Sequence, residues 1–291
     1  MRFPYPWPPM RVLVTGAGGM LGTDVCKAAT DAGFEALPYE RARLDITDAS
    51  AVEAAVRRAR PDVVVNCAAW TDVDGAEASP QAALEVNGAG AGNVARAAAG
   101  CGAWTIHVST DYVFDGSKSE PYLEADPVAP LSEYGRSKLE GERAVAREAP
   151  EQHTIVRSSW LFGVAGRCFP KTILRLAAER DELTVVDDQV GCPTFTSHLA
   201  EALIDLGRTR RLPGVVHVAA AGDCSWFEFA REIVAAAQLP ARIRPGTTSE
   251  MPRPAPRPAY SVLRSERAGA PLLDDWREGL NQFMALRVAV S

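Results

Sequence analysis

The sequence predicts an α/β fold in which a parallel sheet carries helices on both faces, and three observations point to it. Short apolar runs rich in Val and Ile alternate with longer Ala-rich stretches from Arg11 onward. The runs are continuously apolar, which is typical of parallel strands buried on both faces. A glycine-rich turn, TGAGGMLG, joins the first run to the first Ala-rich stretch. Together they predict a Rossmann-type doubly wound parallel sheet with right-handed crossovers.

The expected elements follow one another in a regular order. Strands are expected in RVLVTG, FEALPY, VVVNCA, WTIHVS and HTIVRSSW, where β-branched and aromatic residues gather. Helices are expected over residues 20–32, 49–59, 83–99 and 134–147, where Ala and charged helix formers predominate.

Three parts are expected along the chain. Residues 1–10 are proline-rich and are expected to form a flexible extension, and residues 11–160 an NAD(P)-binding Rossmann domain. Beyond residue 160 the strands become sparser, up to a final helix near residues 272–285. Residues 161–291 are therefore expected to form mainly a small C-terminal substrate-binding lobe, with some elements returning to the Rossmann domain.

The composition narrows the class of partner. A net charge of -6 argues against a nucleic-acid surface, because phosphate binding draws on clustered Lys and Arg. The opening run MRFPYPWPPM lacks the continuous apolar stretch of a signal peptide or membrane span. The six cysteines are scattered without a CxxC pair, which argues against a zinc or disulfide framework. We therefore expect a cytoplasmic protein that binds neither nucleic acid nor membrane.

The glycines of the turn, Gly16, Gly19 and Gly22, have the spacing of a dinucleotide site. Gly16 permits a tight turn, Gly19 lets the backbone approach a pyrophosphate, and Gly22 allows close packing of the helix. A structural turn is the alternative interpretation. The position of the turn at the first strand-to-helix junction favours the cofactor.

The end of the second strand bears on which cofactor is used. Arg41 and Arg43 are suited to pair with a 2'-phosphate, which favours NADPH, whereas Glu40 leaves NADH possible. Asp45 and Ile46, in the following LDIT turn, are placed to contact the adenine.

Tyr134 and Lys138 share one face of a helix and form a YxxxK pair. Reduction of a ketone needs a hydride and a proton, and a nearby ammonium is expected to lower the pKa of the phenol that supplies the proton. By itself, a YxxxK pair is as consistent with an ordinary pair of surface residues on a helix as with a catalytic pair. A hydroxyl at the carboxyl end of strand WTIHVST strengthens the interpretation, since it can donate to a substrate carbonyl. Strand alternation favours Thr110 over Ser109 for this role.

These residues together resemble the extended short-chain dehydrogenase/reductase superfamily and, more narrowly, the dTDP-4-dehydrorhamnose reductase family. The resemblance spans nearly the whole chain from Arg11. The segments that carry it are TGAGGMLG, LDITD, NCAAWTDVDGAE, VN at 86–87, HVSTDYVFDG, YGRSKLEGE, VRSSWLFG, DDQVGCPT and RPAPRPAYSVL.

The resemblance implies a role for each matched residue. Tyr134 is the expected proton donor, Lys138 its electrostatic partner and a ribose ligand, and Thr110 the third catalytic group. Cofactor contacts are implied at Gly19, Met20, Leu21, Asp45, Ile46, Ala69, Trp70 and Thr71. Substrate contacts are implied at Val73, Asp111, Tyr112 and Trp160, and Arg257 is expected to pair with the diphosphate of the substrate.

The reaction implied is reduction of dTDP-4-dehydro-L-rhamnose at C4 to dTDP-L-rhamnose. Two alternatives stay open: a 4-ketoreductase for another dTDP-deoxysugar, as in dihydrostreptose or antibiotic pathways, and a non-catalytic NADP-binding regulatory subunit. Some family members dimerise through magnesium held by glutamates, but Asp24 and Ser197 occupy two matching neighbourhoods here. No metal and a monomer are therefore expected.

Overall fold

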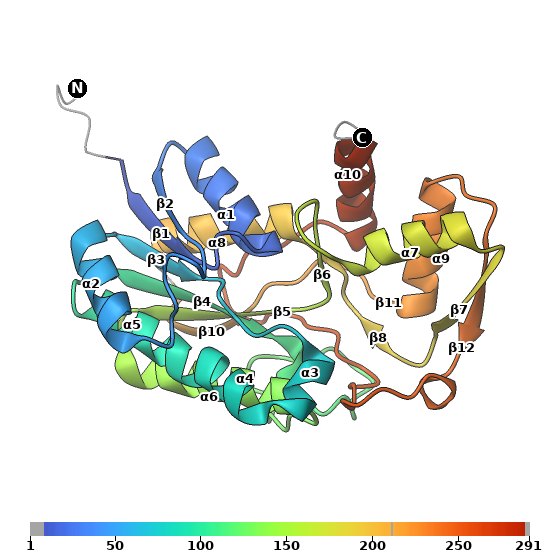
Figure 1. Cartoon of the computed structure of the whole chain (residues 1–291), viewed down its shortest axis with the longest axis horizontal. Coiled ribbons are helices and arrows are strands. Elements are labelled where there is room, and N and C mark those ends of the chain that lie inside the picture. The colour runs from blue at the N-terminus through green and yellow to red at the C-terminus, as the bar shows by residue number, and fades with distance from the viewer. Residues whose placement is uncertain (1–8, 211, 289–291) are drawn as a thin grey trace.

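The computed structural model describes residues 9–210 and 212–288, and its centre is a six-stranded sheet (Figure 1). The strands lie in the order β10, β5, β4, β3, β1, β2, and every neighbouring pair is parallel. Their bounds are β1 Arg11–Thr15, β2 Glu35–Tyr39, β3 Val63–Asn66, β4 Trp104–Thr110, β5 His153–Ser158 and β10 Gly214–His217. The predicted doubly wound parallel sheet is confirmed.

Helices cover both faces of this sheet. In Figure 1, α1 and α8 lie above the sheet, and α2, α5 and α6 lie below it. Their bounds are α1 Met20–Asp31, α2 Ala49–Ala59, α5 Ala91–Ala99, α6 Glu133–Glu148 and α8 Thr196–Thr209. The central strands β3, β4 and β5 are buried along their whole length, because both of their faces meet apolar helix stripes. Continuous apolar strands in the sequence thus correspond to strands covered on both sides.

One predicted helix differs from the expectation. The helix expected over residues 83–99 is divided into α4 (Pro80–Leu84), a π-helical turn η1 (Glu85–Gly90) and α5. The wider turn contains Asn87, whose side chain accepts from Trp70 N at 2.8 Å and donates to Trp70 O at 3.1 Å. The same amide donates to Ser137 Oγ of α6 at 2.9 Å. A π-turn often marks a functional site, and here it lets one side chain join two neighbouring segments.

The C-terminal part builds a second layer around its own apolar cluster, which lies to the right of the sheet in Figure 1. Its helices are α7 Phe169–Glu179, α9 Trp226–Ala236 and α10 Trp276–Val288. Its strand pairs are β6 Leu161–Phe162 with β9 Thr194–Phe195, β8 Val190–Gly191 with β11 Cys224–Ser225, and β7 Glu182–Val186 with β12 Arg242–Gly246. The last helix begins at Trp276 rather than at Leu272, which is 91% exposed. Asp275 accepts the backbone N–H of Arg277 at 2.9 Å at this helix start.

Most of the expected N-terminal extension, residues 1–8, lies outside the described residues. Its last residue, Met10, packs against the apolar core beside β1. Within 9–210 and 212–288, no helix combines the length and apolar character that crossing a bilayer requires.

A buried ion pair ties α6 to the middle of the sheet. Glu142 of α6 accepts from Arg157 of β5 through two bonds, Nε–Oε1 at 2.9 Å and Nη2–Oε2 at 2.7 Å. Ser109 of β4 donates to the same carboxylate at 2.5 Å. Both charged side chains are only 5% exposed. The helix that carries Tyr134 is therefore attached to the end of the strand that carries Thr110.

Glu142→Gln is expected to lower the free energy of unfolding by about 3–5 kcal/mol, because it leaves the Arg157 guanidinium buried without a counter-charge. Urea denaturation measures the loss. Glu140→Gln is the matched control on the same helix, since Glu140 pairs with Arg143 at the exposed surface and such pairs contribute under about 1 kcal/mol. Equal stability losses in the two variants would contradict a structural role for the buried pair.

Candidate active site

The glycine turn between β1 and α1 has the geometry of an anion cradle. Gly16 has φ +67, and a Cβ there would lie 2.7 Å from the backbone nitrogen of Ala68. A Cβ at Gly22 would lie 2.2 Å from the carbonyl oxygen of Gly16. Gly19 caps α1 without a side-chain hydrogen bond, so the first backbone N–H groups of Met20 and Leu21 are free of a side-chain cap. These features fit the pyrophosphate of a dinucleotide.

The residues after β2 include some that suit NADPH and one that suits NADH. The Glu40 side chain lies against the glycine turn, 3.2 Å from where a Cβ of Gly18 would be. The Arg43 guanidinium stacks over Tyr39 at 4.3 Å and donates to Pro38 O at 3.1 Å. Arg41 is exposed. Of the two arginines expected near a 2'-phosphate, Arg43 is therefore already engaged by the protein.

Asp45 and Ile46, the expected adenine contacts, have structural partners as well. Asp45 Oδ1 accepts from the backbone N–H of Thr47 at 3.0 Å and from its hydroxyl at 2.8 Å, and these bonds hold the pKa of Asp45 below its usual value. Ile46 is 4% exposed and lies where a Cβ on Gly90 would approach within 2.8 Å of it. The π-turn and the adenine side of the site are therefore in contact.

The segment after β3 is held in place by hydrogen bonds to its backbone. Ala69, Trp70 and Thr71 connect β3 to α3 (Val73–Ala78). The Asn87 amide holds both backbone polar groups of Trp70, and the Trp70 indole donates to Asp72 O at 2.9 Å. Trp70 is thus fixed in backbone and side chain beside the expected cofactor.

The hydroxyls of Thr110 and Tyr134, the expected catalytic groups, come together at the carboxyl end of β4. The Thr110 hydroxyl hydrogen-bonds the Tyr134 phenol, accepts from Tyr112 N at 3.2 Å and donates to Asp111 Oδ1 at 3.0 Å. Ser109 points to the opposite side, toward Glu142, in the alternation expected of a strand. The Tyr112 ring stands edge-on to the Tyr134 ring with centroids 5.7 Å apart.

The expected effect of Lys138 on the phenol is wrong in this structure. Burial raises the pKa of Tyr134 to about 12, and the Thr110 hydrogen bond opposes this rise only in part. The Lys138 ammonium instead donates to Val108 O at 2.6 Å, and burial lowers the pKa of Lys138 to about 8. Desolvation therefore dominates the pKa of Tyr134, and the Lys138 ammonium, which donates to Val108 O, does not lower it.

Arg257, from the C-terminal part, pairs with Asp74 of α3. Asp74 of α3 accepts two bonds from the Arg257 guanidinium at 2.7 and 2.9 Å and one from Ala255 N at 3.1 Å. Arg257 also hydrogen-bonds Tyr112. The pKa of Asp74 is lowered to about 2, chiefly by the bond from Arg257. The arginine expected to meet a diphosphate is thus oriented by a carboxylate next to Val73.

Trp160 is held in an uncommon conformation. Its φ is +48, in the left-handed region that is costly for a bulky residue. The indole stacks on Trp226 of α9 with centroids 3.5 Å apart and an interplanar angle of 5°. A Cβ on Gly191 would lie 2.4 Å from the same ring. Such a residue is kept in place by its surroundings, as is common at ligand sites.

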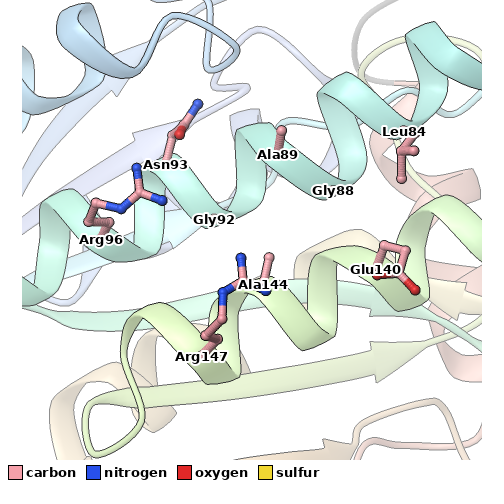
Figure 2. A pocket seen from close by; sticks show the side chains of 9 residues that line it. All are labelled: Leu84, Gly88, Ala89, Gly92, Asn93, Arg96, Glu140, Ala144 and Arg147. Atoms are coloured by element: carbon pink, nitrogen blue, oxygen red, sulfur yellow. The ribbon is translucent and has the colours of Figure 1, made fainter.

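A separate groove lies between α5 and α6, and Figure 2 shows its lining. Gly92 of α5 faces Ala144 of α6 closely, since a Cβ on Gly92 would lie 3.2 Å from Ala144 Cβ, and Gly88 of η1 also lines the groove. Exposed charged side chains are among its lining residues. The lining residues are Leu84, Gly88, Ala89, Gly92, Asn93, Arg96, Glu140, Ala144 and Arg147. None of the residues expected to bind cofactor or substrate is among them.

Metal ligands were not expected from the sequence. Across the described ranges 9–210 and 212–288, no group of three or more His, Cys, Asp or Glu side chains is arranged to hold a metal ion. Asp24 instead accepts from the Thr196 hydroxyl at 2.5 Å.

Four residues around the site were missed by the sequence reasoning as site residues: Asp74, Asn87, Glu142 and Trp226. Asn87 and Glu142 both lie on helix faces. For Glu142 the sequence does contain a signal, because the YxxxKxxxE spacing places it one turn beyond Lys138 on the same face. Asp74 and Trp226 meet partners 183 and 66 positions away, which no local pattern reveals.

The comparisons with known proteins agree with this geometry. The family model described as "RmlD substrate binding domain" matches residues 10–288. A dTDP-4-dehydrorhamnose reductase of Streptomyces griseus is 44% identical over 292 residues, covering 97% of this chain and 95% of that protein. A probable dTDP-4,6-dihydroxy-2-methyloxan-3-one 4-ketoreductase of Streptomyces antibioticus is 41% identical, with 94% of each chain covered.

A solved structure supports the same relationship. The dTDP-4-dehydrorhamnose reductase of Bacillus anthracis, crystallised in complex with NADP, superposes with a TM-score of 0.92 at 38% identity. The match covers 96% of this chain and 99% of that chain.

Gly22→Ala is expected to weaken dinucleotide binding by roughly tenfold or more and to destabilise the fold by about 1–3 kcal/mol, since the new methyl group overlaps the Gly16 carbonyl. Titration calorimetry with NADP and thermal unfolding measure the two effects. Gly100→Ala is the control, because its Cβ would meet nothing closer than 3.4 Å. Unchanged dinucleotide affinity in Gly22→Ala would show that the turn does not form the cradle.

Proposed function

This chain belongs to the RmlD family, and from that premise we propose that it reduces the C4 ketone of dTDP-4-dehydro-L-rhamnose to dTDP-L-rhamnose with NADPH. The observation that carries the proposal is the meeting of Thr110 and Tyr134 at the carboxyl end of β4. The glycine cradle follows β1 at the same edge of the sheet, where ligands bind in α/β folds.

Each residue has a distinct task in this reaction. NADPH, when bound, supplies the hydride that reduces the carbonyl carbon. The Tyr134 phenol gives its proton to the carbonyl oxygen as the C=O double bond becomes a C–O single bond, and a phenolate remains. The Thr110 hydroxyl donates a hydrogen bond to the same oxygen and stabilises its developing charge.

Lys138 supports the phenolate once the proton has left. Its ammonium is buried beside the end of β4 and is charged below about pH 8. If it is brought close to Tyr134, this positive charge stabilises the phenolate electrostatically, and the effect grows when the site excludes water. A shift of the ammonium from Val108 O toward the cofactor ribose would place it for this task.

The substrate side is assembled from three segments. Tyr112 lies just after Thr110, and Trp160 lies after β5. Arg257 belongs to the C-terminal part and is oriented by its ion pair with Asp74. Val73 and Asp111 complete the expected contacts. An aromatic wall suits the sugar or base, and a guanidinium suits a diphosphate.

The second candidate is a 4-ketoreductase that acts on another dTDP-sugar. The Streptomyces antibioticus 4-ketoreductase supports this candidate. It is 41% identical to this chain, and the dTDP-4-dehydrorhamnose reductase of Streptomyces griseus is 44% identical, so the two sequence identities are similar. A non-catalytic regulatory role is less consistent with intact Thr110, Tyr134 and Lys138. We further propose that the protein acts as a monomer in the cytoplasm.

Wild-type protein is expected to oxidise NADPH when enzymatically prepared dTDP-4-dehydro-L-rhamnose is added, as followed by absorbance. Tyr134→Phe is expected to lower kcat by roughly 10²- to 10⁴-fold, because the proton donor is lost. Tyr122→Phe, a buried phenol that bonds Asp115 outside the site, is the control. No oxidation by wild type, or faster oxidation with a different dTDP-ketosugar, would favour the alternatives.

Arg41→Ala is expected to raise KM for NADPH by roughly 10- to 100-fold and to leave KM for NADH unchanged, since one charged hydrogen bond to the 2'-phosphate is removed. Steady-state kinetics with both cofactors measure the difference. Arg58→Ala, at an exposed arginine of α2, is the control. An equal change with the two cofactors would remove Arg41 from the cofactor site.

A further inference from the structure

Asp111 presents a buried carboxyl group directly beside the catalytic hydroxyls. The residue is 1% exposed and follows Thr110 at the end of β4. Its Oδ1 accepts from the Thr110 hydroxyl at 3.0 Å, whereas its Oδ2 is buried without a hydrogen-bond partner. A buried carboxylate with one unpartnered oxygen is costly, so this group favours the protonated form.

The hydrogen bonds of Thr110 can be counted. A hydroxyl has one proton to donate and two lone pairs with which to accept. An ionised Asp111 can only accept, so it takes the single Thr110 proton. Thr110 Oγ1 then accepts from Tyr112 N at 3.2 Å, and the Tyr134 phenol can only donate to the same oxygen. With Asp111 ionised, both reactive protons therefore point along the row Tyr134, Thr110, Asp111.

We propose that protonated Asp111 is the positioning residue that turns the Thr110 hydroxyl toward the substrate ketone and so makes the site competent. A carboxylic acid donates to Thr110 Oγ1 in place of accepting from it. The Thr110 proton is then free for the ketone oxygen, and the Tyr134 phenol is released from Thr110 to donate to the same oxygen. This inference rests on the proposed ketone reduction.

No proton from Asp111 is consumed in the reaction. The proton that forms the product hydroxyl comes from Tyr134, and the Asp111 proton stays in its bond to Thr110. Asp111 acts only by setting the direction of two hydrogen bonds. It therefore controls how many molecules are competent at a given pH.

The surroundings of Asp111 support a protonated form near neutral pH. Burial raises its pKa to about 6, and the nearby hydroxyls of Ser261 and Thr110 counteract the rise in part. The ionisable groups on which its charge acts are Tyr134 of α6, Tyr112 of its own turn and Cys192 between β8 and β9, and it raises the pKa of each. A bound diphosphate sugar adds negative charge and excludes water, and both effects raise the pKa of Asp111 further.

The test compares the pH dependence of kcat/KM in wild type and in Asp111→Asn, with NADPH and the ketosugar. Between the pKa of Asp111 and about pH 8, where Lys138 begins to lose its charge, wild type is expected to lose about tenfold in kcat/KM for each pH unit. Asp111→Asn is expected to lack the decline within this window and to exceed wild type near pH 8, because the amide N–H donates to Thr110 at every pH. Asp205→Asn, at an exposed carboxylate of α8, is the control.

Thr110→Val distinguishes a positioning role from a merely structural one. This variant is expected to be slow at every pH and to gain nothing from added Asp111→Asn. A wild-type decline between about pH 6 and pH 8 that persists in Asp111→Asn, or an equal loss of activity at every pH in Asp111→Asn and Thr110→Val, would overturn the proposal.

Infrared difference spectra provide a readout that needs no turnover. The C=O stretch of a protonated carboxylic acid is followed against pH in wild type and is absent in Asp111→Asn. Persistence of the band above about pH 5, where an ordinary Asp is ionised, is expected. Its loss below that pH overturns the inference even if the enzyme is active. An inactive wild type that keeps the band contradicts the proposed function instead.

Discussion

The buried bond between Glu142 and Arg157 is the constraint on which the geometry of the site depends. It joins α6 to β5, and the Ser109 hydroxyl extends it to β4. Breaking such a pair is costly because either partner alone would be a buried, uncompensated charge. This pair fixes the position of α6 along β4, and with it the positions of Tyr134 and Lys138 relative to Thr110. The positions of Tyr134 and Lys138 thus follow from an interaction two helical turns beyond Tyr134 and one beyond Lys138.

Desolvation is the second constraint, and it acts on every ionisable group of the site. Burial raises the pKa of Tyr134 to about 12 and that of Asp111 to about 6, and it lowers the pKa of Lys138 to about 8. All three shifts favour the uncharged form. A phenol that keeps its proton is a suitable store for the proton that ketone reduction consumes. The same burial ensures that a charge arriving with a ligand interacts strongly with the residues around it.

The C-terminal part contributes through two contacts that span long stretches of chain. Asp74 binds Arg257 and the neighbouring backbone of Ala255, which attaches the proline-rich segment to α3. Trp226 stacks on Trp160, whose positive φ is maintained by the fit of that ring between Trp226 and Gly191. Both contacts involve residues expected to meet substrate. The residues expected to meet substrate therefore come from both layers of the fold.

The sequence by itself determined the parallel sheet, the glycine cradle and the placement of Thr110, Tyr134 and Lys138, because each follows from a local period or spacing. Strand alternation separates Ser109 from Thr110, and helical spacing puts Lys138 beside Tyr134. Only the tertiary structure decided the π-turn at Asn87, the engagement of Arg257 by Asp74, and the direction in which the Lys138 ammonium points. It also decided that burial, rather than the lysine charge, controls the pKa of Tyr134. The physical reason is that burial and long-range pairing depend on which distant segments cover a residue. A local sequence pattern does not specify those segments.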